Sequence, residues 1–276
     1  MIDIDAFHRD GVACVRGVLT EQEIDALRAA VDDQVGKLGS TSSGYDFEEI
    51  SRQIWQDDSV EVGDADRFDI AFIKDRVRED ENARPLLEEQ SSSEGMFFYD
   101  AAGWRRYEGI ANVALRSALP RTVASLWPTE YVTFWEDTTF VKAPGTRQKT
   151  AFHQDLTYFQ ISGTQCAVCW IPLDPANLSN GVTRYIRGSH LWGETYAPNL
   201  VVSQTPTSAA VDPKCPDIEG NEDAYEFISF DVEPGDVIIH DVRTIHGAGG
   251  NLSTKNRRAL SFRYCGDDIR YLDRKG

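Results

Sequence analysis

The chain has 276 residues, of which 41% are hydrophobic, and it carries a formal net charge of −17. This length and apolar content suffice for one full hydrophobic core, so we expect a single domain over residues 1–276. The negative charge argues against nucleic acid or an anionic membrane as a partner, because its summed field repels phosphates. Without a basic and apolar leader or an apolar run of membrane-spanning length, the sequence predicts a cytoplasmic protein. The composition does not reveal the oligomeric state.

The first part of the chain predicts helices and loops around a sheet. Residues 7–19 have the pattern of a short helix followed by a strand. Thr20 and Glu23 then make a capping box, which predicts the start of an amphipathic helix. Residues 39–94 are polar with scattered aromatics, which favours helices and loops on the periphery. A further helix is expected over residues 109–124. Its inward-facing residues should be Ile110, Val113, Leu115 and Ala118.

After Pro128 the pattern changes to short strands separated by turns. β-Branched and aromatic residues gather in segments bounded by Gly, Pro, Asn and Asp, which is typical of strands. The clearest segments are residues 131–135, 139–142, 166–173, 237–239 and 259–264. We therefore predict a closed or two-sheet antiparallel barrel over about residues 129–266, with helical and loop elaboration over about 1–128.

A Pro-rich, acidic stretch at residues 203–223 shows no periodicity. Long irregular loops inside compact domains often cover a functional site. Two interpretations are open for this stretch: a lid over a binding site, or a plain surface loop.

Cys166 and Cys169 are spaced as a C-x-x-C motif within an apolar segment. On a strand, an offset of three residues puts the two side chains on opposite faces. The odd number of cysteines, five in all, also fits no disulfide framework. We therefore predict that both thiols are small buried side chains rather than a redox or metal pair.

A candidate metal site begins at His153-Gln154-Asp155, within an apolar and aromatic run. Side chains alternate along a strand, so His153 and Asp155 project to one side while Gln154 points away. A distant His246 would complete two imidazoles and one carboxylate, the set that holds non-haem Fe(II) with open coordination sites. The same residues also fit a Zn-dependent hydrolase, or a binding module whose histidines are hydrogen-bonded in the core.

A local excess of basic residues accompanies this site. Between Thr138 and Gly193 the only acidic residues are Asp155 and Asp174. A positive pocket in an acidic protein suits a small anionic ligand, although the same residues could be solvated on loops. The basic residues are Lys142, Arg147, Lys149, Arg184 and Arg187.

Several ordered motifs resemble the phytanoyl-CoA dioxygenase family of Fe(II)- and 2-oxoglutarate-dependent oxygenases. They span roughly residues 130–265, and the amino-terminal strand and capped helix are also similar to that family's start. The motifs are residues 142–145, 153–159, Trp170, Asn180-Gly181, residues 188–190, residues 234–236, His240, His246-Gly247 and Arg257.

The resemblance implies a mainly β fold with peripheral helices around a double-stranded β-helix, the jelly-roll core of cupin-like proteins. It also implies that His153, Asp155 and His246 are both catalytic residues and the ligands of Fe(II). Arg257 would bind the distal carboxylate of the cosubstrate 2-oxoglutarate, for which a planar guanidinium is well suited. Trp170 and Thr138 match positions that line or touch this cosubstrate.

Two positions refine the implied chemistry. Close relatives often carry a serine two residues after the second ligand histidine, where this chain has Ala248. The loss of that hydroxyl should weaken 2-oxoglutarate binding modestly, because the charge pair with Arg257 is retained. Halogenating relatives replace the ligand carboxylate with a small residue, so Asp155 argues against halogenation.

The implied activity is hydroxylation of an aliphatic carbon of a small molecule, with consumption of O2 and release of succinate and CO2. The same oxidative chemistry can also desaturate, epimerise or close rings, and the sequence does not separate these outcomes. The substrate itself is not indicated. Candidate pocket residues are Trp135, Phe152, Tyr158, Phe159, Phe98, Tyr99 and Arg187, each of which could equally belong to the core or the surface.

The remaining histidines receive supporting roles. His240 is six residues before His246 and resembles a recurrent family position, so we expect it beside the ligands rather than among them. His190 is expected to complete a turn, and His8 to cap local structure.

Overall fold

The computed structural model describes residues 2–38, 44–47, 95–199, 201–202 and 213–272. Most of the region predicted to hold peripheral helices and loops, residues 39–94, lies outside these ranges. So does the first part of the candidate lid, residues 203–212, while its described part from residue 213 onward ends in a short 3-10 helix, η5 (Glu219–Ala224). No helix in the described ranges is long and apolar enough to cross a membrane.

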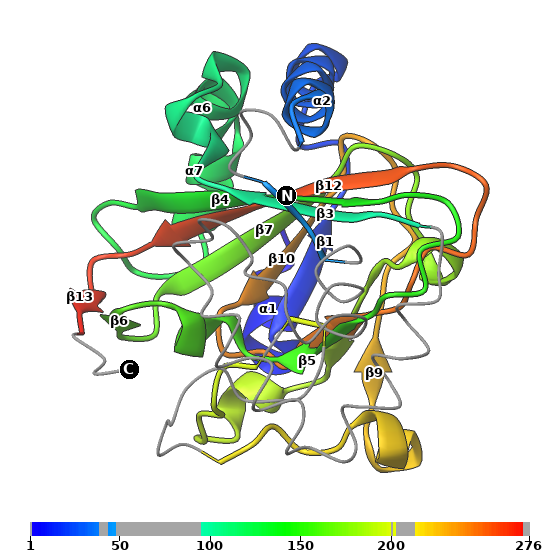
Figure 1. The fold of residues 1–276 in the computed structure, drawn as a ribbon. Helices are drawn as coiled ribbons and strands as arrows, with labels where there is room; N and C mark the ends of the chain where they lie inside the picture. The colour runs from blue at the N-terminus through cyan, green and yellow to red at the C-terminus, as the bar shows by residue number, and fades with distance from the viewer. Residues whose placement is uncertain (1, 39–43, 48–94, 200, 203–212, 273–276) are drawn as a thin grey trace.

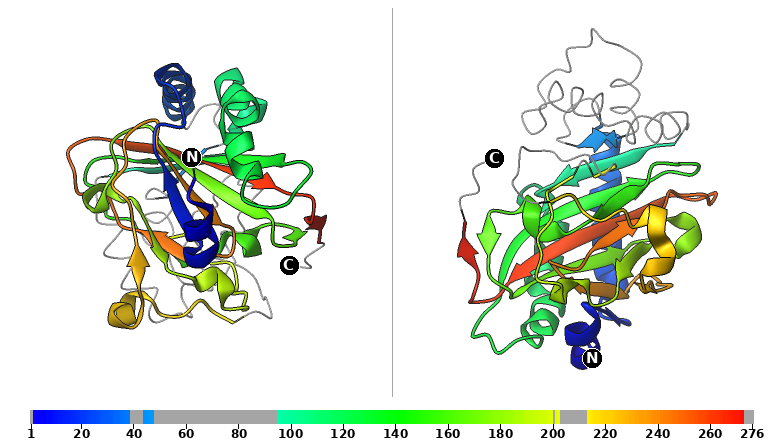
Figure 2. Two further views of the ribbon diagram at one scale, coloured as in Figure 1. Left: turned by 180° about the vertical axis from the view of Figure 1, so that it is seen from behind. Right: turned by 90° about the horizontal axis from the view of Figure 1, so that it is seen from below.

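Two antiparallel sheets form the centre of the fold (Figures 1 and 2). The larger sheet has seven strands in the order β1 (Val12–Val15), β10 (Val237–Asp241), β7 (Cys166–Pro172), β12 (Arg257–Cys265), β4 (Thr133–Lys142), β3 (Phe97–Ala101) and β2 (Tyr45–Asp46). The smaller sheet has four strands in the order β5 (Thr150–His153), β11 (His246–Ala248), β8 (Thr183–Ile186) and β9 (Phe227–Ile228). A separate pair joins β13 (Arg270–Tyr271) to β6 (Ile161–Ser162). The predicted jelly-roll architecture is confirmed, and β1 to β3 extend the larger sheet with residues that precede position 129.

Helices cover the outer face of the larger sheet, away from the smaller one (Figure 1). They are α2 (Glu21–Gly36), α6 (Glu108–Arg116) and α7 (Leu119–Ala124), while α1 (Ile4–Asp10) precedes β1. The predicted capping box is confirmed, because Thr20 and Glu23 exchange hydrogen bonds at the start of α2.

The helix predicted over residues 109–124 is two helices, because a proline in the first turn of α7 cannot continue a preceding helix. This break changes which side chains turn inward. Leu115, with 53% of its surface exposed, and Ala118 face solvent, contrary to the prediction. Ala114 and Leu119 are buried in their place.

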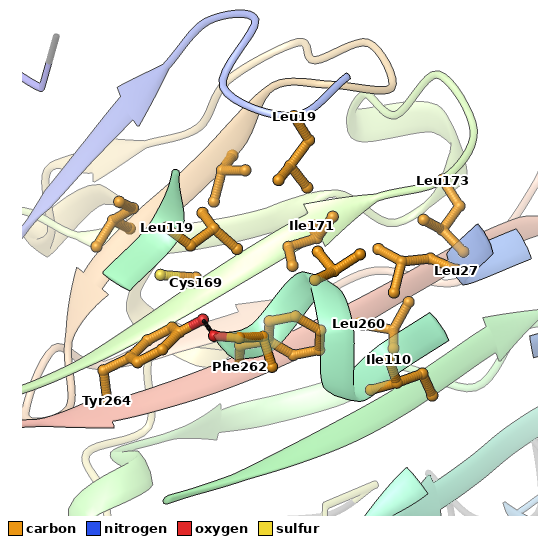
Figure 3. Packing of buried hydrophobic residues seen from close by; sticks show 14 of the residues in the cluster. Leu19, Leu27, Ile110, Leu119, Cys169, Ile171, Leu173, Leu260, Phe262 and Tyr264 are labelled. Carbon is orange, nitrogen blue, oxygen red and sulfur yellow. Dashed lines mark hydrogen bonds between the residues drawn. The ribbon is translucent and has the colours of Figure 1, made fainter. Parts of the chain in front are cut away.

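The main core lies between these helices and the larger sheet (Figure 3). Leu260, Phe262 and Tyr264 of β12 point towards the helices, where Ile110 is buried among them. The Tyr264 hydroxyl donates a 2.7 Å hydrogen bond to the carbonyl of Ala114, so the single polar atom of this side chain is satisfied.

Strand β4 joins two segments that the sequence predicted as separate strands. Arg263 pairs with Glu136, whereas the next residue, Tyr264, pairs with Phe134. Trp135 is therefore an extra residue in a β-bulge, and the alternation of inward and outward side chains along β4 changes phase there.

The two cysteines of the C-x-x-C motif lie on opposite faces of β7, as predicted. Cys169 packs in the core beneath the helices, while Cys166 belongs to a cluster on the other face. Both are free thiols. Cys166 Sγ lies 3.8 Å from Cys265 Sγ on the neighbouring strand.

Candidate active site

The three predicted metal ligands meet between the two strands β5 and β11 of the smaller sheet. His153 is the last residue of β5 and pairs directly with His246, the first residue of β11. Gln154 keeps an extended backbone, with φ −106° and ψ 136°, so the alternation continues and Asp155 returns to the side of His153. One ligating atom from each of the three buried residues lies within 4.8 Å of the others.

The middle residue of this motif fixes the chain around the site. The Gln154 amide nitrogen donates to the carbonyls of Glu194 and Arg243, at 3.1 and 2.9 Å. Its amide oxygen accepts a hydrogen bond from the backbone of Tyr196. Gln154 therefore holds two distant loops together on the side opposite the ligands.

Hydrogen bonds show which ring nitrogen carries the proton in both ligand histidines. His153 Nδ1 is 2.7 Å from the carbonyl of Ala151, and His246 Nδ1 is 2.9 Å from that of Thr244. A carbonyl only accepts, so each Nδ1 carries the proton and each Nε2 is left to bind a metal. Asp155 Oδ1 lies 3.3 Å from His153 Nε2 and 3.8 Å from His246 Nε2.

The environment sets the charge states that metal binding needs. Burial, followed by the neighbouring His153, lowers the pKa of His246 well below its usual value, which keeps the imidazole neutral. Burial by itself would raise the pKa of Asp155, but His246, His153, His240 and Arg263 together lower it well below its usual value. A neutral imidazole and an ionised carboxylate are the forms that coordinate a cation.

His240 lies on the other side of the ligand carboxylate. Its Nε2 is 3.5 Å from Asp155 Oδ2, whereas Oδ1 faces the two ligand histidines. Its ring centroid is 4.5 Å from that of His246 and 5.0 Å from that of Tyr185, which stacks on His246 and is tilted against His240. This placement beside the ligands is the one expected from the sequence.

Arg257 begins β12 and lines the same cavity as the three ligands. Its guanidinium lies 5.7 Å from the ring of Trp170, and its Nε donates a 3.4 Å hydrogen bond to the carbonyl of Asn180. Burial lowers the pKa of Arg257 to about 10, so the group still carries its charge at neutral pH. In the described part of the chain no carboxylate forms an ion pair with it.

The Asn180-Gly181 motif has a physical reason in this position. Gly181 has φ +82°, and a Cβ there would lie 2.6 Å from the carbonyl oxygen of Gly249. Only glycine fits such an approach without strain. The motif thereby brings the Asn180 carbonyl to Arg257, next to the cavity wall formed by Ala248.

The cavity contains some of the predicted pocket residues. Tyr99, Tyr158 and Phe159 line it, together with Trp170. Thr138 contributes indirectly, because its hydroxyl accepts a 2.6 Å hydrogen bond from Arg263 Nη1, and its predicted contact with 2-oxoglutarate stays a prediction.

Four other predicted pocket residues lie elsewhere. Phe98 and Phe152 are adjacent to residues that face the cavity, so strand alternation turns both into apolar clusters on the opposite side. Trp135 occupies the β-bulge and is 37% exposed. Arg187 forms ion pairs with Asp10 and Glu226, at 2.6 and 2.7 Å.

The predicted basic surroundings are also rearranged by tertiary contacts. Lys142 is buried, and its Nζ donates to the carbonyls of Gln148 and Gly249. Arg184 forms an ion pair with Glu222, and Lys149 lies 3.6 Å from a carboxylate of η5. Among the described residues, the arginines that line the cavity are instead Arg257 and Arg263.

Sequence reasoning missed several cavity residues. The alternation along β12 could have revealed two of them, because Ser261 and Arg263 are four and six residues after Arg257 and share its face. The others depend on strand pairing over long distances in the chain. The missed residues are Phe97, Glu136, Phe140, Thr150, Thr183, Val201, Ser261 and Arg263.

The similarity of this protein to known proteins extends over nearly the whole chain. The model of the family described as phytanoyl-CoA dioxygenase (PhyH) matches residues 7–259. The chain belongs to this family. Phytanoyl-CoA dioxygenase domain-containing protein 1 of Danio rerio is 24% identical over 272 residues, which cover 94% of this chain and 88% of the relative. Family membership confirms the class of enzyme predicted from the sequence.

Solved structures similar to this chain include two enzymes of nogalamycin biosynthesis. The non-haem α-ketoglutarate-dependent carbocyclase SnoK superimposes with a TM-score of 0.65 and 20% identity, covering 98% of this chain and 85% of SnoK. The epimerase SnoN, solved with Fe3+, α-ketoglutarate and nogalamycin RO, gives 0.60 and 19%, covering 98% of this chain and 84% of SnoN. At such identities the likeness shows a shared fold.

Proposed function

We propose that this protein is an Fe(II)- and 2-oxoglutarate-dependent dioxygenase that hydroxylates an aliphatic carbon of a small molecule. Succinate and CO2 would be the coproducts. The observation that carries the proposal is the buried charge of Arg257 in the same cavity as His153, Asp155 and His246. Three ligands alone would also serve a zinc hydrolase, but a buried cation beside them suits a dicarboxylate cosubstrate.

Each residue then has a defined part. His153, Asp155 and His246 hold Fe(II) and leave coordination sites free for 2-oxoglutarate and O2. Bound there, iron and 2-oxoglutarate together supply the oxidising power for attack on an unactivated C–H bond. Arg257 pairs with the distal carboxylate of 2-oxoglutarate, and the ring of Trp170 forms the adjacent wall. The solved complex of SnoN with Fe3+ and α-ketoglutarate supports this choice of cofactor and cosubstrate.

Other outcomes of the same chemistry are distinguished by product analysis. Desaturation, epimerisation or ring closure would give a product without an added oxygen atom. The carboxylate of Asp155 occupies the position that a halide needs in halogenating relatives, which favours oxygenation over halogenation. A product heavier than the substrate by one oxygen atom, labelled from 18O2, would support hydroxylation.

The decisive experiment measures succinate release by the purified protein with Fe(II), 2-oxoglutarate and O2. His246→Ala should abolish it, because two remaining ligands hold the metal poorly. In the absence of O2, Fe(II) plus 2-oxoglutarate should raise the melting temperature of the wild type. If Zn(II) alone stabilised the protein and Fe(II) plus 2-oxoglutarate did nothing, the hydrolase interpretation would replace this one.

Arg257→Gln tests the cosubstrate site separately. Loss of a buried charge pair costs about 2–5 kcal/mol, so the KM for 2-oxoglutarate should rise at least about 30-fold. Arg184→Gln is the matched control, since Arg184 pairs with Glu222 outside this cavity, and its KM should equal that of the wild type. An unchanged KM in the Arg257 variant would remove this residue from the 2-oxoglutarate site.

A further inference from the structure

A second arginine, Arg263, lines the cavity on the same strand as Arg257. Six residues of β-strand separate the two Cα atoms by about 20 Å. Their surroundings also differ, because Arg257 lies against Trp170 whereas Arg263 lies 5.1 Å from the ring of Phe159. The two guanidinium groups therefore belong to different ends of the cavity, and a single 2-oxoglutarate carboxylate cannot account for both.

The guanidinium of Arg263 is held in place but only partly used. Its side chain is 7% exposed, and Nη1 donates to the hydroxyl of Thr138 at 2.6 Å and to the carbonyl of Ser261 at 3.5 Å. Nε is buried without a hydrogen-bond partner. Among the described residues, Nη2 also forms no hydrogen bond. A planar Nε–Nη2 edge with two free donors fits a carboxylate or a phosphate side-on.

The acid nearest to this cation is Glu136, which does not form a hydrogen bond with it. Its carboxylate lies 3.9 Å from Arg263 Nη1, beyond hydrogen-bonding distance, and its side chain is 32% exposed. Buried charges in proteins are normally both paired and hydrogen-bonded. The loose contact with Glu136 leaves Arg263 able to accept a second anion.

The charges of the proposed cofactors make such an anion favourable. The two positive charges of Fe(II) and that of Arg257 offset Asp155 and the two carboxylates of 2-oxoglutarate. Asp155 also stabilises the charge of Arg263, but this carboxylate is shared with the metal, and the other acid close to Arg263 is the partly exposed Glu136. An anion that met this edge would supply the partner that the buried Nε lacks, through charge-assisted hydrogen bonds in a poorly hydrated place.

We propose that Arg263 binds an anionic group of the primary substrate, a carboxylate or a phosphate, through its Nε–Nη2 edge. This inference rests on the proposed function and specifies its substrate class. The remainder of the substrate packs against the aromatic wall formed by Tyr99, Phe140 and Phe159. Fixing one end of the substrate at Arg263 determines which carbon faces the metal, so Arg263 is a specificity-determining residue.

The test uses the full chain with Fe(II) and 2-oxoglutarate and a panel of matched compounds. The panel contains small aliphatic and aromatic carboxylates, their phosphate analogues, and the corresponding neutral amides and alcohols. Succinate release above the rate without added compound is measured in air, and the shift in melting temperature is measured without O2. We expect acids or phosphates to stimulate turnover and stabilise the protein, and their neutral counterparts to fail. The better of the two anionic series identifies the group.

Substitutions test whether binding of the anionic compound depends on Arg263. Arg263→Gln should raise the KM for the best anionic compound at least about 30-fold, as expected for one lost buried charge pair, and leave the KM for 2-oxoglutarate unchanged. Arg263→Lys should restore part of the affinity, because it keeps the charge without the planar edge. Glu136→Gln should lower the KM, since it removes the competing carboxylate. Arg187→Gln, which alters an ion pair outside the cavity, is the matched control with wild-type constants.

Three results would overturn the inference. The first is equal stimulation by neutral compounds, and the second is an unchanged KM for the anion in Arg263→Gln. The third is a panel in which no carboxylate or phosphate stimulates or stabilises the wild type. Succinate release without any added compound is independent of Arg263 and would still support the proposed function. Its absence from the wild type would instead count against the proposed function itself.

Discussion

Neighbouring residues of strand β12 point to opposite faces of the sheet, one of them apolar and the other polar. Leu260 and Phe262 point under the helices, where they are fully buried among apolar side chains. Arg257, Ser261 and Arg263 point into the cavity. The helix-side face is filled by the protein itself, whereas the other face presents polar side chains to a cavity. One strand thus contributes to the core on one side and to the cavity wall on the other.

The neighbouring strand β4 shows the same division. Val141 packs in the core under the helices, and Asp137 accepts hydrogen bonds there from the backbone of Gly103 and Trp104. Glu136 and Phe140 face the cavity. The β-bulge at Trp135 marks where this alternation changes phase. We can therefore perturb each face without altering the other.

The largest effect on the helix-side face should come from Phe262→Ala. Removing a fully buried aromatic ring costs about 3–5 kcal/mol of the free energy of unfolding, measured by urea denaturation. Phe262→Leu keeps most of the apolar volume and should cost less. The KM for 2-oxoglutarate of the folded variant should stay at the wild-type value, and a rise in it would show that the two faces are coupled.

Asp137 provides a pH-dependent test of the same face. Burial raises the pKa of Asp137 from 3.8 to about 6, although the backbone donors of Trp104 and Gly103 partly counter it. Between these values the folded state holds a proton that the unfolded state has lost. Stability from this group is therefore present below pH 3.8 and falls as the pH rises through about 6.

Asp137→Asn isolates this contribution, because asparagine does not titrate. The free energy of unfolding of the wild type relative to the variant should fall by about 2 kcal/mol between pH 4 and pH 7. Urea denaturation of both proteins at several pH values measures the difference. A difference that does not vary with pH would mean that the carboxyl is ionised throughout this range.

The smallest effect is expected at His240, on the cavity face. His240→Leu removes the group that faces Asp155 Oδ2, and loss of such a partner typically lowers metal affinity about 10-fold or more. His240→Gln keeps a donor and should recover part of the affinity. Fe(II) binding measured without O2 reports this, while circular dichroism checks the fold. Equal affinities in the wild type and both variants would exclude a positioning role.

Local patterns in the sequence determined several features correctly. The capping box of Thr20 and Glu23, the opposite faces of Cys166 and Cys169, and the two-sheet fold follow from residue spacing over short distances. The spacing of His153 and Asp155 likewise put both on one side. These predictions succeed because backbone geometry alone sets the direction of neighbouring side chains.

Tertiary structure decided what lies opposite each of these side chains. The pairing of His246 with His153 depends on the register of strands more than ninety residues apart. Arg187 pairs with Asp10 at the other end of the chain, which removes it from the pocket, while Arg263 takes a place in the cavity. Alternation determines which residues of a strand share a face. Only the packing of the strand against other elements decides which face the helices cover and which face lines the cavity.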